Sequence, residues 1–423
     1  MPLTALSLLL ATVLASAPAG AATADSDAVM VSARSAHEQP TDAGRLTLTP
    51  ESGPARVPFD LLVNHIYMRG RVNESDSLWM VLDSGAGGNV IDATVAKQLG
   101  LTVTTMGRGR GAGGYVDAGQ VPSVSVKLPG VTLDSVPITT MPLESFKRQS
   151  GRPMDVIIGQ PLIERCVLRI DYASRMLEFL PAQTFQYAGK GAIVPLTIRF
   201  GHPYIQACIT LPEHDPIEGQ FVVDLGSSQA VILTPAFIEM RHVTDEIGRT
   251  IEARGRGVGG QLTSRVGRIP SVEVGGITFE RPITMLPVST GAMVGASDAI
   301  GNIGGEIMRR FTVTLDYSRK RMILEPNAQL REPFDADMSG LGMRMGPDGS
   351  NALEVEWIQS DSPASEAGVQ PNDLIERIDG RPALEIGVSG LRAMSRHDGE
   401  RHVLSIRRGD HTLEIPITNR RMI

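Results

Sequence analysis

Two aspartates stand at the ends of apolar segments and are the residues best placed to do chemistry. Asp83 directly follows the apolar run Leu78–Leu82, and Asp224 directly follows the run Phe221–Val223. A carboxylate at the end of a buried strand is costly unless it is used or paired. A glycine stands two residues after each aspartate, and glycine allows a tight loop in which backbone N–H groups approach the carboxylate closely.

The equivalent placement of the two aspartates indicates what they could do together. If two similar loops face each other across a pseudo-twofold axis, Asp83 and Asp224 share one proton, because adjacent carboxylates do not ionise together easily. The ionised member can activate a water, and the protonated member can polarise a scissile carbonyl. This is general acid–base hydrolysis of a peptide bond, without a covalent intermediate or a metal. The alternative is that each aspartate only caps a turn, but duplication at matching positions favours catalysis.

An internal repeat supports this pairing. Six segments recur in the same order at offsets between 137 and 148 residues, which is too long for a solenoid unit and typical of two similar lobes. The matched pairs are Asn64–Arg69 with Gly201–Gln206, Met80–Gly85 with Val222–Gly226, Gly109–Gly114 with Gly255–Gly260, Pro122–Val126 with Pro270–Val274, Pro137–Thr139 with Pro282–Thr284, and Arg169–Tyr172 with Thr314–Tyr317. Short Val, Ile, Leu and Thr runs between Gly, Pro and Asn are strand and turn signals. We therefore expect two mostly antiparallel β lobes, lobe 1 over residues 56–182 and lobe 2 over residues 188–328.

The residues around Asp83 resemble those of a known family. Asp83-Ser84-Gly85-Ala86, followed by Val156-Ile157-Ile158-Gly159, is similar to the pattern of bacterial retropepsin-like aspartic proteases, and Asp224-Leu225-Gly226 with Asn302-Ile303-Gly304 is a weaker copy. The resemblance covers about residues 56–328. It implies a mainly β, bilobal retropepsin-like acid-protease fold in which one chain carries both halves of the active site. The site residues that it implies are Asp83 and Asp224 as catalytic residues, and Ser84, Gly85 and Gly226 as support for the catalytic loops.

Lobe 2 departs from the family pattern at two positions. Leu225 stands where the family usually has Thr or Ser, whose hydroxyl hydrogen-bonds across the lobe interface and holds the two loops rigid. Asn302 replaces an apolar residue beneath the loop. The resemblance implies an aspartic-type endopeptidase, and the two departures keep open the alternative of a catalytically inactive peptide-binding protein on the same folds.

Two glycine-rich segments match the pattern G-x-G-x-x-G. A dinucleotide-binding site needs a strand before this pattern and a helix after it, whereas polar residues, a proline and a β-type run follow it here. The resemblance implies instead that each segment is a flap, a hairpin that closes over substrate and is hinged by glycine. The alternative is an ordinary glycine-rich hairpin. The flap glycines are Gly111, Gly113, Gly114, Gly257, Gly259 and Gly260.

Residues 335–420 resemble a bacterial PDZ domain. The signature S-P-A, A-G, D-L-I and I-D-G occurs in this order within Ser362–Gly380. Such a domain adds a peptide as a strand and holds its terminal carboxylate with backbone N–H groups, so a peptide or protein terminus is the expected partner. The alternative is a domain that only packs against the protease lobes. The residues expected to bind the carboxylate are Leu341, Gly342 and Met343.

The N-terminal segment is typical of a secretory signal peptide. Residues 1–24 contain no charged side chain, and an apolar run of 13 residues is followed by A-x-A sites. The run is shorter than the ~20 residues that span a bilayer, so we expect cleavage, a periplasmic or secreted protein, and no stable membrane insertion. Residues 25–55 are small, polar and aperiodic, which predicts a disordered lead-in. In an oxidising compartment Cys166 and Cys208 could pair, or both could be buried free thiols.

Composition excludes several other classes of function. The chain has 423 residues, with 40 basic and 47 acidic side chains and a formal charge of −7, which argues against binding to nucleic acid. Two cysteines are too few for a disulfide scaffold or a cysteine-built zinc site, and neither H-E-x-x-H nor G-x-S-x-G occurs. We therefore expect no metal and no cofactor, and a peptide or protein as substrate.

Overall fold

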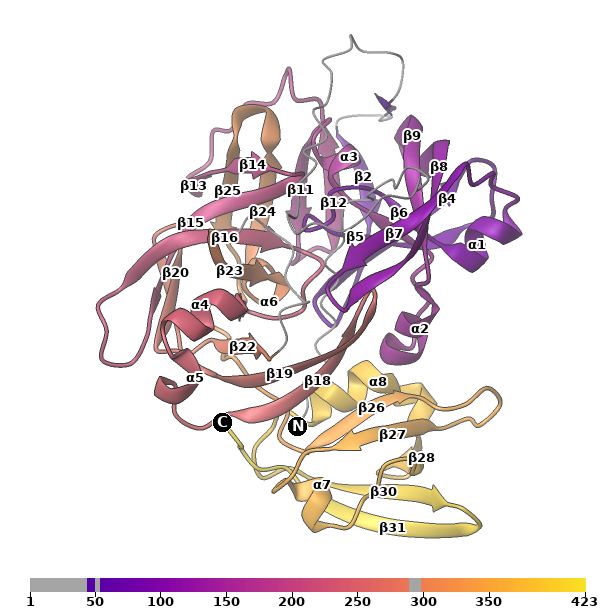
Figure 1. Cartoon of the computed structure of the whole chain (residues 1–423), viewed down its shortest axis with the longest axis vertical. Coiled ribbons are helices and arrows are strands. Elements are labelled where there is room, and N and C mark those ends of the chain that lie inside the picture. Colours follow the sequence, from indigo (N-terminus) through magenta and orange to yellow (C-terminus); the bar gives the residue numbers. More distant parts are fainter. Residues whose placement is uncertain (1–43, 50–53, 289–297) are drawn as a thin grey trace, which may run out of the picture.

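The computed structural model describes residues 44–49, 54–288 and 298–423, and this part of the chain is mainly β (Figure 1). It forms two related lobes, a sheet that joins them, and a C-terminal domain with its own sheet. The mainly β, bilobal fold class expected from the sequence is therefore confirmed. No helix in the described part is long and apolar enough to cross a membrane. The expected signal peptide lies outside the described residues.

Lobe 1 is built on a mixed sheet. Its strands are β1 (Arg45–Leu48), β3 (Asp60–Leu62), β4 (His65–Val72), β5 (Leu78–Leu82), β6 (Val90–Asp92), β7 (Thr105–Gly111), β8 (Gly114–Leu128), β9 (Val131–Met141) and β10 (Val156–Ile158), and its helices are α1 (Ala93–Gln98), α2 (Glu144–Ser150) and α3 (Gln160–Ile163). The strand order is β1-β9-β6-β10-β5-β4-β8-β7, with β3 beside β4. Helix α1 begins at Asp92 because its carboxylate accepts hydrogen bonds from the N–H groups of Thr94 and Val95.

Lobe 2 repeats this design. Its strands are β14 (Thr197–Arg199), β15 (His202–Thr210), β16 (Ile217–Asp224), β17 (Val231–Leu233), β18 (Ile251–Gly257), β19 (Gly260–Arg268), β20 (Ser271–Val274), β21 (Ile277–Glu280), β22 (Ile283–Pro287) and β23 (Ala299–Gly304), and its helices are α4 (Pro235–Met240), α5 (Val243–Glu246) and α6 (Gly305–Met308). The order is β18-β19-β22-β17-β23-β16-β15-β20-β21, with β14 beside β15. In both lobes the strand that leads into the aspartate, β5 or β16, lies parallel to a late strand, β10 or β23.

A third sheet joins the two lobes. Its strands, in spatial order, are β13 (Ala192–Pro195), β25 (Arg321–Pro326), β24 (Phe311–Asp316), β11 (Val167–Asp171), β12 (Met176–Leu180) and β2 (Ala55–Pro58), with the turn η2 (Tyr317–Arg319) between β24 and β25. Strands β11 and β24 pair antiparallel at its centre, with Leu168 opposite Leu315. Each lobe contributes three strands, so the sheet carries the same pseudo-twofold relation as the lobes.

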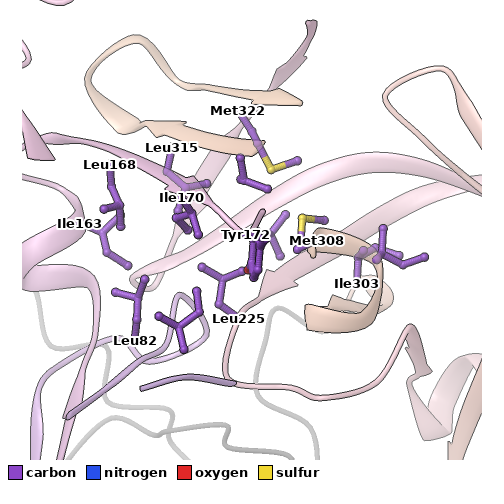
Figure 2. Packing of buried hydrophobic residues seen from close by; sticks show 14 of the residues in the cluster. Leu82, Ile163, Leu168, Ile170, Tyr172, Leu225, Ile303, Met308, Leu315 and Met322 are labelled. Carbon is purple, nitrogen blue, oxygen red and sulfur yellow. The ribbon is translucent and has the colours of Figure 1, made fainter. Parts of the chain in front are cut away.

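One hydrophobic core continues across this joint. Figure 2 shows labelled core side chains from both lobes, among them Leu82 and Leu225, the neighbours of the two aspartates, together with Tyr172. Leu82 and Leu225 have no exposed surface, and Tyr172 has 1%. Burying apolar surface at about 25 cal/mol per Å² makes such a core the main source of stability. The aspartate segments of the two lobes therefore rest on a single packed unit.

The C-terminal domain has its own core and its own sheet. Its elements are β26 (Leu341–Met345), β27 (Leu353–Ile358), α7 (Pro363–Glu366), β28 (Leu374–Ile378), β29 (Arg381–Pro382), α8 (Ala383–Met394), β30 (Arg401–Arg408) and β31 (His411–Thr418). The strand order is β26-β27-β28-β30-β31, with β29 beside β28, and β26 is therefore an edge strand. Buried side chains such as Leu353, Ile375 and Leu404 form a separate cluster.

The C-terminal domain also touches both lobes. From lobe 1, α2 packs against β26, and the Arg148 guanidinium lies 2.7 Å from the Glu354 carboxylate. From lobe 2, the Arg254 guanidinium on β18 lies 5.1 Å from the ring centroid of Trp357 on β27. Figure 1 shows the domain below α2 and the β18–β19 hairpin.

Two expectations about the chain ends and the cysteines need correction or refinement. The disordered lead-in expected over residues 25–55 does not hold at Arg45–Leu48, which forms β1 and pairs with β9. Leu46 and Leu48 pack against the main core, a long-range contact that a polar local composition conceals.

Both cysteines are free thiols, Cys166 buried and Cys208 only partly so. Burial raises the pKa of the Cys166 thiol to about 12.

Candidate active site

The two aspartate loops, residues 83–86 and 224–227, sit at equivalent places in the lobes. Asp83 follows β5, and Asp224 ends β16. Each loop is backed by a late glycine that cannot be replaced, since a Cβ on Gly159 would lie 2.4 Å from the Ala86 carbonyl oxygen, and Gly304 is crowded by its own loop in the same way. The glycine that ends each hydrophobic strand therefore lets the aspartate loop lie directly on it.

The structure brings the two carboxyl groups together in a buried site. Neither Asp83 nor Asp224 has exposed surface, and their side chains are hydrogen-bonded to each other. Gly85 and Gly226 lie beside both groups. A Cβ on Gly85 would lie 2.7 Å from Asp224 Oδ1 and 3.1 Å from Asp83 Oδ1, and one on Gly226 would lie 2.3 Å from Asp83 Oδ2. Glycine is required at both positions because any side chain would push the carboxyl groups apart.

Burial and mutual repulsion keep a proton on this pair. Burial, followed by the charge of Asp224, raises the pKa of Asp83 well above its usual range. Burial also raises the pKa of Asp224, to about 7, although hydrogen bonds from its neighbours act in the opposite direction. Asp83 Oδ2 and Asp224 Oδ1 accept no N–H or O–H hydrogen bond from the described residues. These two oxygens are therefore the ones available to a shared proton and a substrate water.

Ser84 connects the two loops across the lobe interface. Its hydroxyl donates a hydrogen bond of 2.7 Å to the Val223 carbonyl oxygen and accepts one of 3.0 Å from the Leu225 N–H group. Leu225 cannot return this contact, and its side chain packs in the core instead. Ser227 is not a substitute, because its hydroxyl accepts from the Gln229 N–H group in its own loop. The cross-lobe hydroxyl contact is thus made from lobe 1 alone.

Asn302 contacts the aspartate pair directly. Its side-chain Nδ2 donates a hydrogen bond of 3.0 Å to Asp224 Oδ2, and this contact lowers the pKa of Asp224 against the larger effect of burial. The equivalent position in lobe 1 is Ile157, which is apolar and fully buried. What the sequence presents as a departure from the pattern therefore supplies a donor to one of the two carboxylates and makes the pair asymmetric.

The glycine-rich segments form two hairpins whose tips meet. Strands β7 and β8 make one hairpin and β18 and β19 the other, with no helix in either. The Gly113 N–H group donates a hydrogen bond of 2.8 Å to the Val258 carbonyl oxygen of the other hairpin. A Cβ on Gly111 would lie 2.3 Å from that oxygen, and one on Gly259 would lie 2.3 Å from the Gly114 carbonyl oxygen. The remaining tip glycines, Gly257 and Gly260, end β18 and begin β19.

The residues expected to hold a peptide carboxylate lie away from the aspartates, in the C-terminal domain. Leu341, Gly342 and Met343 open the edge strand β26. The Leu341 N–H group donates to the Ser339 hydroxyl at 3.2 Å. Just before the strand, the Asp337 carboxylate accepts from the Ser339 N–H group at 2.6 Å. A carboxylate of the chain itself thus occupies the loop next to the expected peptide site.

Sequence reasoning missed two histidines that contact the aspartate loops. His65 and His202 are buried and each reaches the loop of the opposite lobe. The signal was present in the repeat, since the matched segments Asn64–Arg69 and Gly201–Gln206 both carry histidine as second residue. No group of three or more His, Cys, Asp or Glu side chains that could hold a metal ion occurs among the residues that the structure describes.

Family models match two parts of this chain. Residues 68–162 match the family model described as aspartyl protease, and residues 354–408 match the model described as PDZ domain. No curated protein matches the chain. One similar solved structure, the aspartic proteinase from Irpex lacteus, has 12% sequence identity and a TM-score of 0.41, covering 67% of this chain and 100% of that chain. The resemblance stated from the sequence is confirmed: the chain carries an aspartyl protease domain followed by a PDZ domain.

Proposed function

We propose that this protein is an aspartic-type endopeptidase, in which Asp83 and Asp224 activate a water that hydrolyses a peptide bond. The observation that carries the proposal is the hydrogen-bonded contact between two fully buried carboxyl groups from equivalent loops. An isolated buried carboxylate would destabilise the fold. Two of them in contact, with raised pKa values and two oxygens free of protein donors, form an acid–base pair ready to exchange protons with a substrate.

The groups around the two carboxyls indicate which aspartate acts as the base and which as the acid. The Asn302 donor favours the negative charge on Asp224, and burial with that charge nearby keeps the proton on Asp83. Asp224 removes a proton from the water as its oxygen attacks the carbonyl carbon, while Asp83 gives its proton to the carbonyl oxygen. The tetrahedral intermediate collapses when Asp224 passes its proton to the leaving nitrogen and Asp83 recovers one from the intermediate, which restores the starting state.

The partners of the proposal follow from the two domains. The substrate is a peptide or protein that enters beneath the two flaps, and the PDZ domain binds a peptide terminus along its edge strand β26. Location in the periplasm or outside the cell follows from the expected signal peptide. The PDZ domain rests against α2 and the β18–β19 hairpin, so recruitment and cleavage occur on neighbouring surfaces.

The test is hydrolysis of a peptide library across a pH series by the wild type and by Asp83→Asn and Asp224→Asn variants. Each variant should lose activity by about 10²–10⁴-fold, the range that general acid–base catalysis supplies. Asp76→Asn, which alters an exposed aspartate of lobe 1, is the matched control and should keep full activity. Full activity in both dyad variants would disprove the assignment.

One structural feature favours a second candidate, a peptide-binding protein without turnover. Leu225 removes the reciprocal hydroxyl contact, so the two loops are fixed from one side only. On this alternative no peptide in the library is cleaved at any pH, while a peptide with a free C-terminus still binds. Calorimetry with library peptides beside the cleavage assay therefore separates the two functions.

A further inference from the structure

Two buried histidines cross from one lobe to the aspartate loop of the other. His65 opens β4 in lobe 1, and His202 opens β15 in lobe 2. They are 0% and 3% exposed, so neither is a surface residue. His65 Nε2 lies 3.0 Å from the carbonyl oxygen of Gly226. His202 lies beside the Asp83 loop, where its Nε2 is 3.9 Å from the place that a Cβ on Gly87 would take, and the Gly85 backbone raises its pKa. The two contacts are related by the pseudo-twofold axis of the lobes.

The same type of turn presents each histidine. Val63 and Asn64 have φ values of 50° and 63°, and Phe200 and Gly201 have φ values of 52° and 80°. Two successive residues with positive φ make the tight two-residue turn that joins antiparallel strands, here β3 to β4 and β14 to β15. A positive φ is unfavourable for a β-branched residue such as Val63, so the surrounding structure must hold this turn in place.

Hydrogen bonds define the state of the imidazoles. A carbonyl oxygen only accepts hydrogen bonds, so the His65 Nε2 that faces Gly226 carries the hydrogen. The contact with Gly85 raises the pKa of His202, which identifies the backbone group as the carbonyl, while burial lowers that pKa more strongly. Nδ1 of His202 has no hydrogen-bond partner among the described residues, so Nε2 makes the contact. We therefore assign Nε2–H as the group of His202 that faces Gly85, while burial lowers the pKa of the ring.

The contact made by His65 bears on Asp224 through one peptide group. The carbonyl of Gly226 and the N–H of Ser227 belong to the same planar trans peptide and point in opposite directions. The Ser227 N–H group donates to the main-chain carbonyl oxygen of Asp224 at 3.2 Å and also faces the Asp224 carboxylate, whose pKa it lowers. Holding the carbonyl from one side therefore aims the N–H at the carboxylate on the other, and polarises it as a donor.

The contact made by His202 has the same consequence for Asp83. The carbonyl of Gly85 and the N–H of Ala86 form one peptide group. The Ala86 N–H donates to the main-chain carbonyl oxygen of Asp83 at 3.3 Å and also lowers the pKa of the Asp83 carboxylate. His202 comes from lobe 2, whereas the peptide and the aspartate belong to lobe 1. Each lobe thus orients the amide donor that faces the catalytic carboxylate of the other lobe.

We propose that His65 and His202 are a reciprocal pair of positioning residues that fix the two aspartate loops across the lobe interface. The histidines supply a symmetric connection between lobes where the hydroxyl connection is one-sided, since only Ser84 makes it. They act through the loop peptides and exchange no proton with substrate. This inference rests on the proposed hydrolytic function and identifies which residues keep its acid–base pair aligned.

The kinetic test compares removal of the donor with its replacement. His65→Leu and His202→Leu should each lower kcat about ten- to a hundredfold, the effect of misplacing a reacting group by about 1 Å, while KM for a library-selected fluorogenic peptide changes less than threefold. His65→Gln and His202→Gln place an amide N–H near the position of Nε2 and should recover most of the loss. His411→Leu, at an exposed histidine of the PDZ domain, is the control and should match the wild type.

A spectroscopic test needs no turnover. In the full chain labelled with ¹⁵N-histidine, two imidazoles should show the neutral Nε2–H tautomer with slowly exchanging hydrogens, and each signal should vanish in one Gln variant. Full kcat in both Leu variants, or rapidly exchanging and freely titrating signals for both histidines, would overturn the inference. If the wild type cleaves no peptide, the proposed function fails, and the imidazole spectra alone then decide the role of the histidines.

Discussion

Asn302 Nδ2 and Asp224 Oδ2 lie 3.0 Å apart beside the aspartate pair, and the described part of lobe 1 has no equivalent of this hydrogen bond. Ile157 occupies the matched place in lobe 1, so the duplicated site is asymmetric at the point where charge matters most. A hydrogen bond to the charged form of a carboxylate favours that form. We therefore expect this asymmetry to favour the negative charge on Asp224.

Asn302→Ile gives lobe 2 the residue that lobe 1 has at this position. The ionised form of Asp224 then loses a stabilising hydrogen bond, so the pKa of Asp224 should rise. Hydrogen bonds to charged groups contribute about 1.5–3 kcal/mol, which corresponds to about one to two pH units. We expect the acid limb of the kcat/KM profile to move upward by about that amount, because the catalytic base now keeps its proton to higher pH. Ile157→Val is the control in lobe 1, and an acid limb that stays at its wild-type position in Asn302→Ile contradicts the assignment.

Ser84→Ala should lower both the stability of the protein and its rate of peptide hydrolysis. The hydroxyl is buried, and its removal leaves the Val223 carbonyl and the Leu225 N–H without this partner. An unsatisfied buried polar group costs about 1–3 kcal/mol, which urea denaturation measures. Ser84→Thr keeps the hydroxyl and should lie closer to the wild type. Ser227→Ala, which loses only a contact within its own loop, should cost less, and equal losses for the two alanine variants would refute a cross-lobe role.

The raised pKa of Asp224 also makes a prediction about stability. The folded protein binds a proton on Asp224 up to a pKa of about 7, whereas an unfolded aspartate releases it near its ordinary value of 3.8. The folded state therefore binds more protons between these values, and its stability falls as pH rises through about 7. Asp224→Asn removes this dependence. The free energy of unfolding of the variant, relative to that of the wild type, should therefore rise by on the order of a few kcal/mol from pH 4 to pH 8.

Urea denaturation at five or six pH values measures this trend. The exposed Asp76→Asn variant should follow the wild type at every pH. A difference between Asp224→Asn and wild type that stays constant with pH would show that the carboxyl pair holds no extra proton in the folded state.

The sequence predicts those parts of the site that depend on local pattern. An apolar strand that runs into Asp-x-Gly, repeated once, is enough to place Asp83 and Asp224 on equivalent loops. The fold class follows from the same repeat, because two similar β lobes must bury their apolar faces against each other. Loop support by Ser84 is implied by the family resemblance and not by the local pattern, and the structure places its hydroxyl between the two loops.

The remaining features depend on contacts between segments far apart in the chain. His65 and Gly226 are separated by 161 positions, and nothing in the neighbourhood of His65 shows which carbonyl it meets. Asn302 looks like a defect when only its apolar equivalent is known, because its partner is set by the parallel pairing of β16 with β23. The strand β1 is concealed for the same reason, since its partner β9 lies more than 80 residues later.

The contact between the tips of the two glycine-rich hairpins gives the last prediction. Gly113 donates a hydrogen bond to Val258, and a Cβ at position 113 would lie 2.3 Å from the backbone nitrogen of Gly260. Backbone atoms of the opposite hairpin cannot give way as a flexible side chain could, so Gly113→Ala must hold the tips apart. Because closed lids exclude water and complete a catalytic site, kcat/KM for a library-selected peptide should fall about tenfold or more.

The fold should tolerate Gly113→Ala, because Gly113 is only partly buried and its φ is not positive. A melting temperature within a few degrees of the wild type separates loss of the lid from loss of structure. Asp117→Ala, on the exposed side of β8 in the same hairpin, is the matched control and should retain full activity. Undiminished kcat/KM in Gly113→Ala would mean that the two tips need not touch for hydrolysis, and that each flap closes on substrate independently.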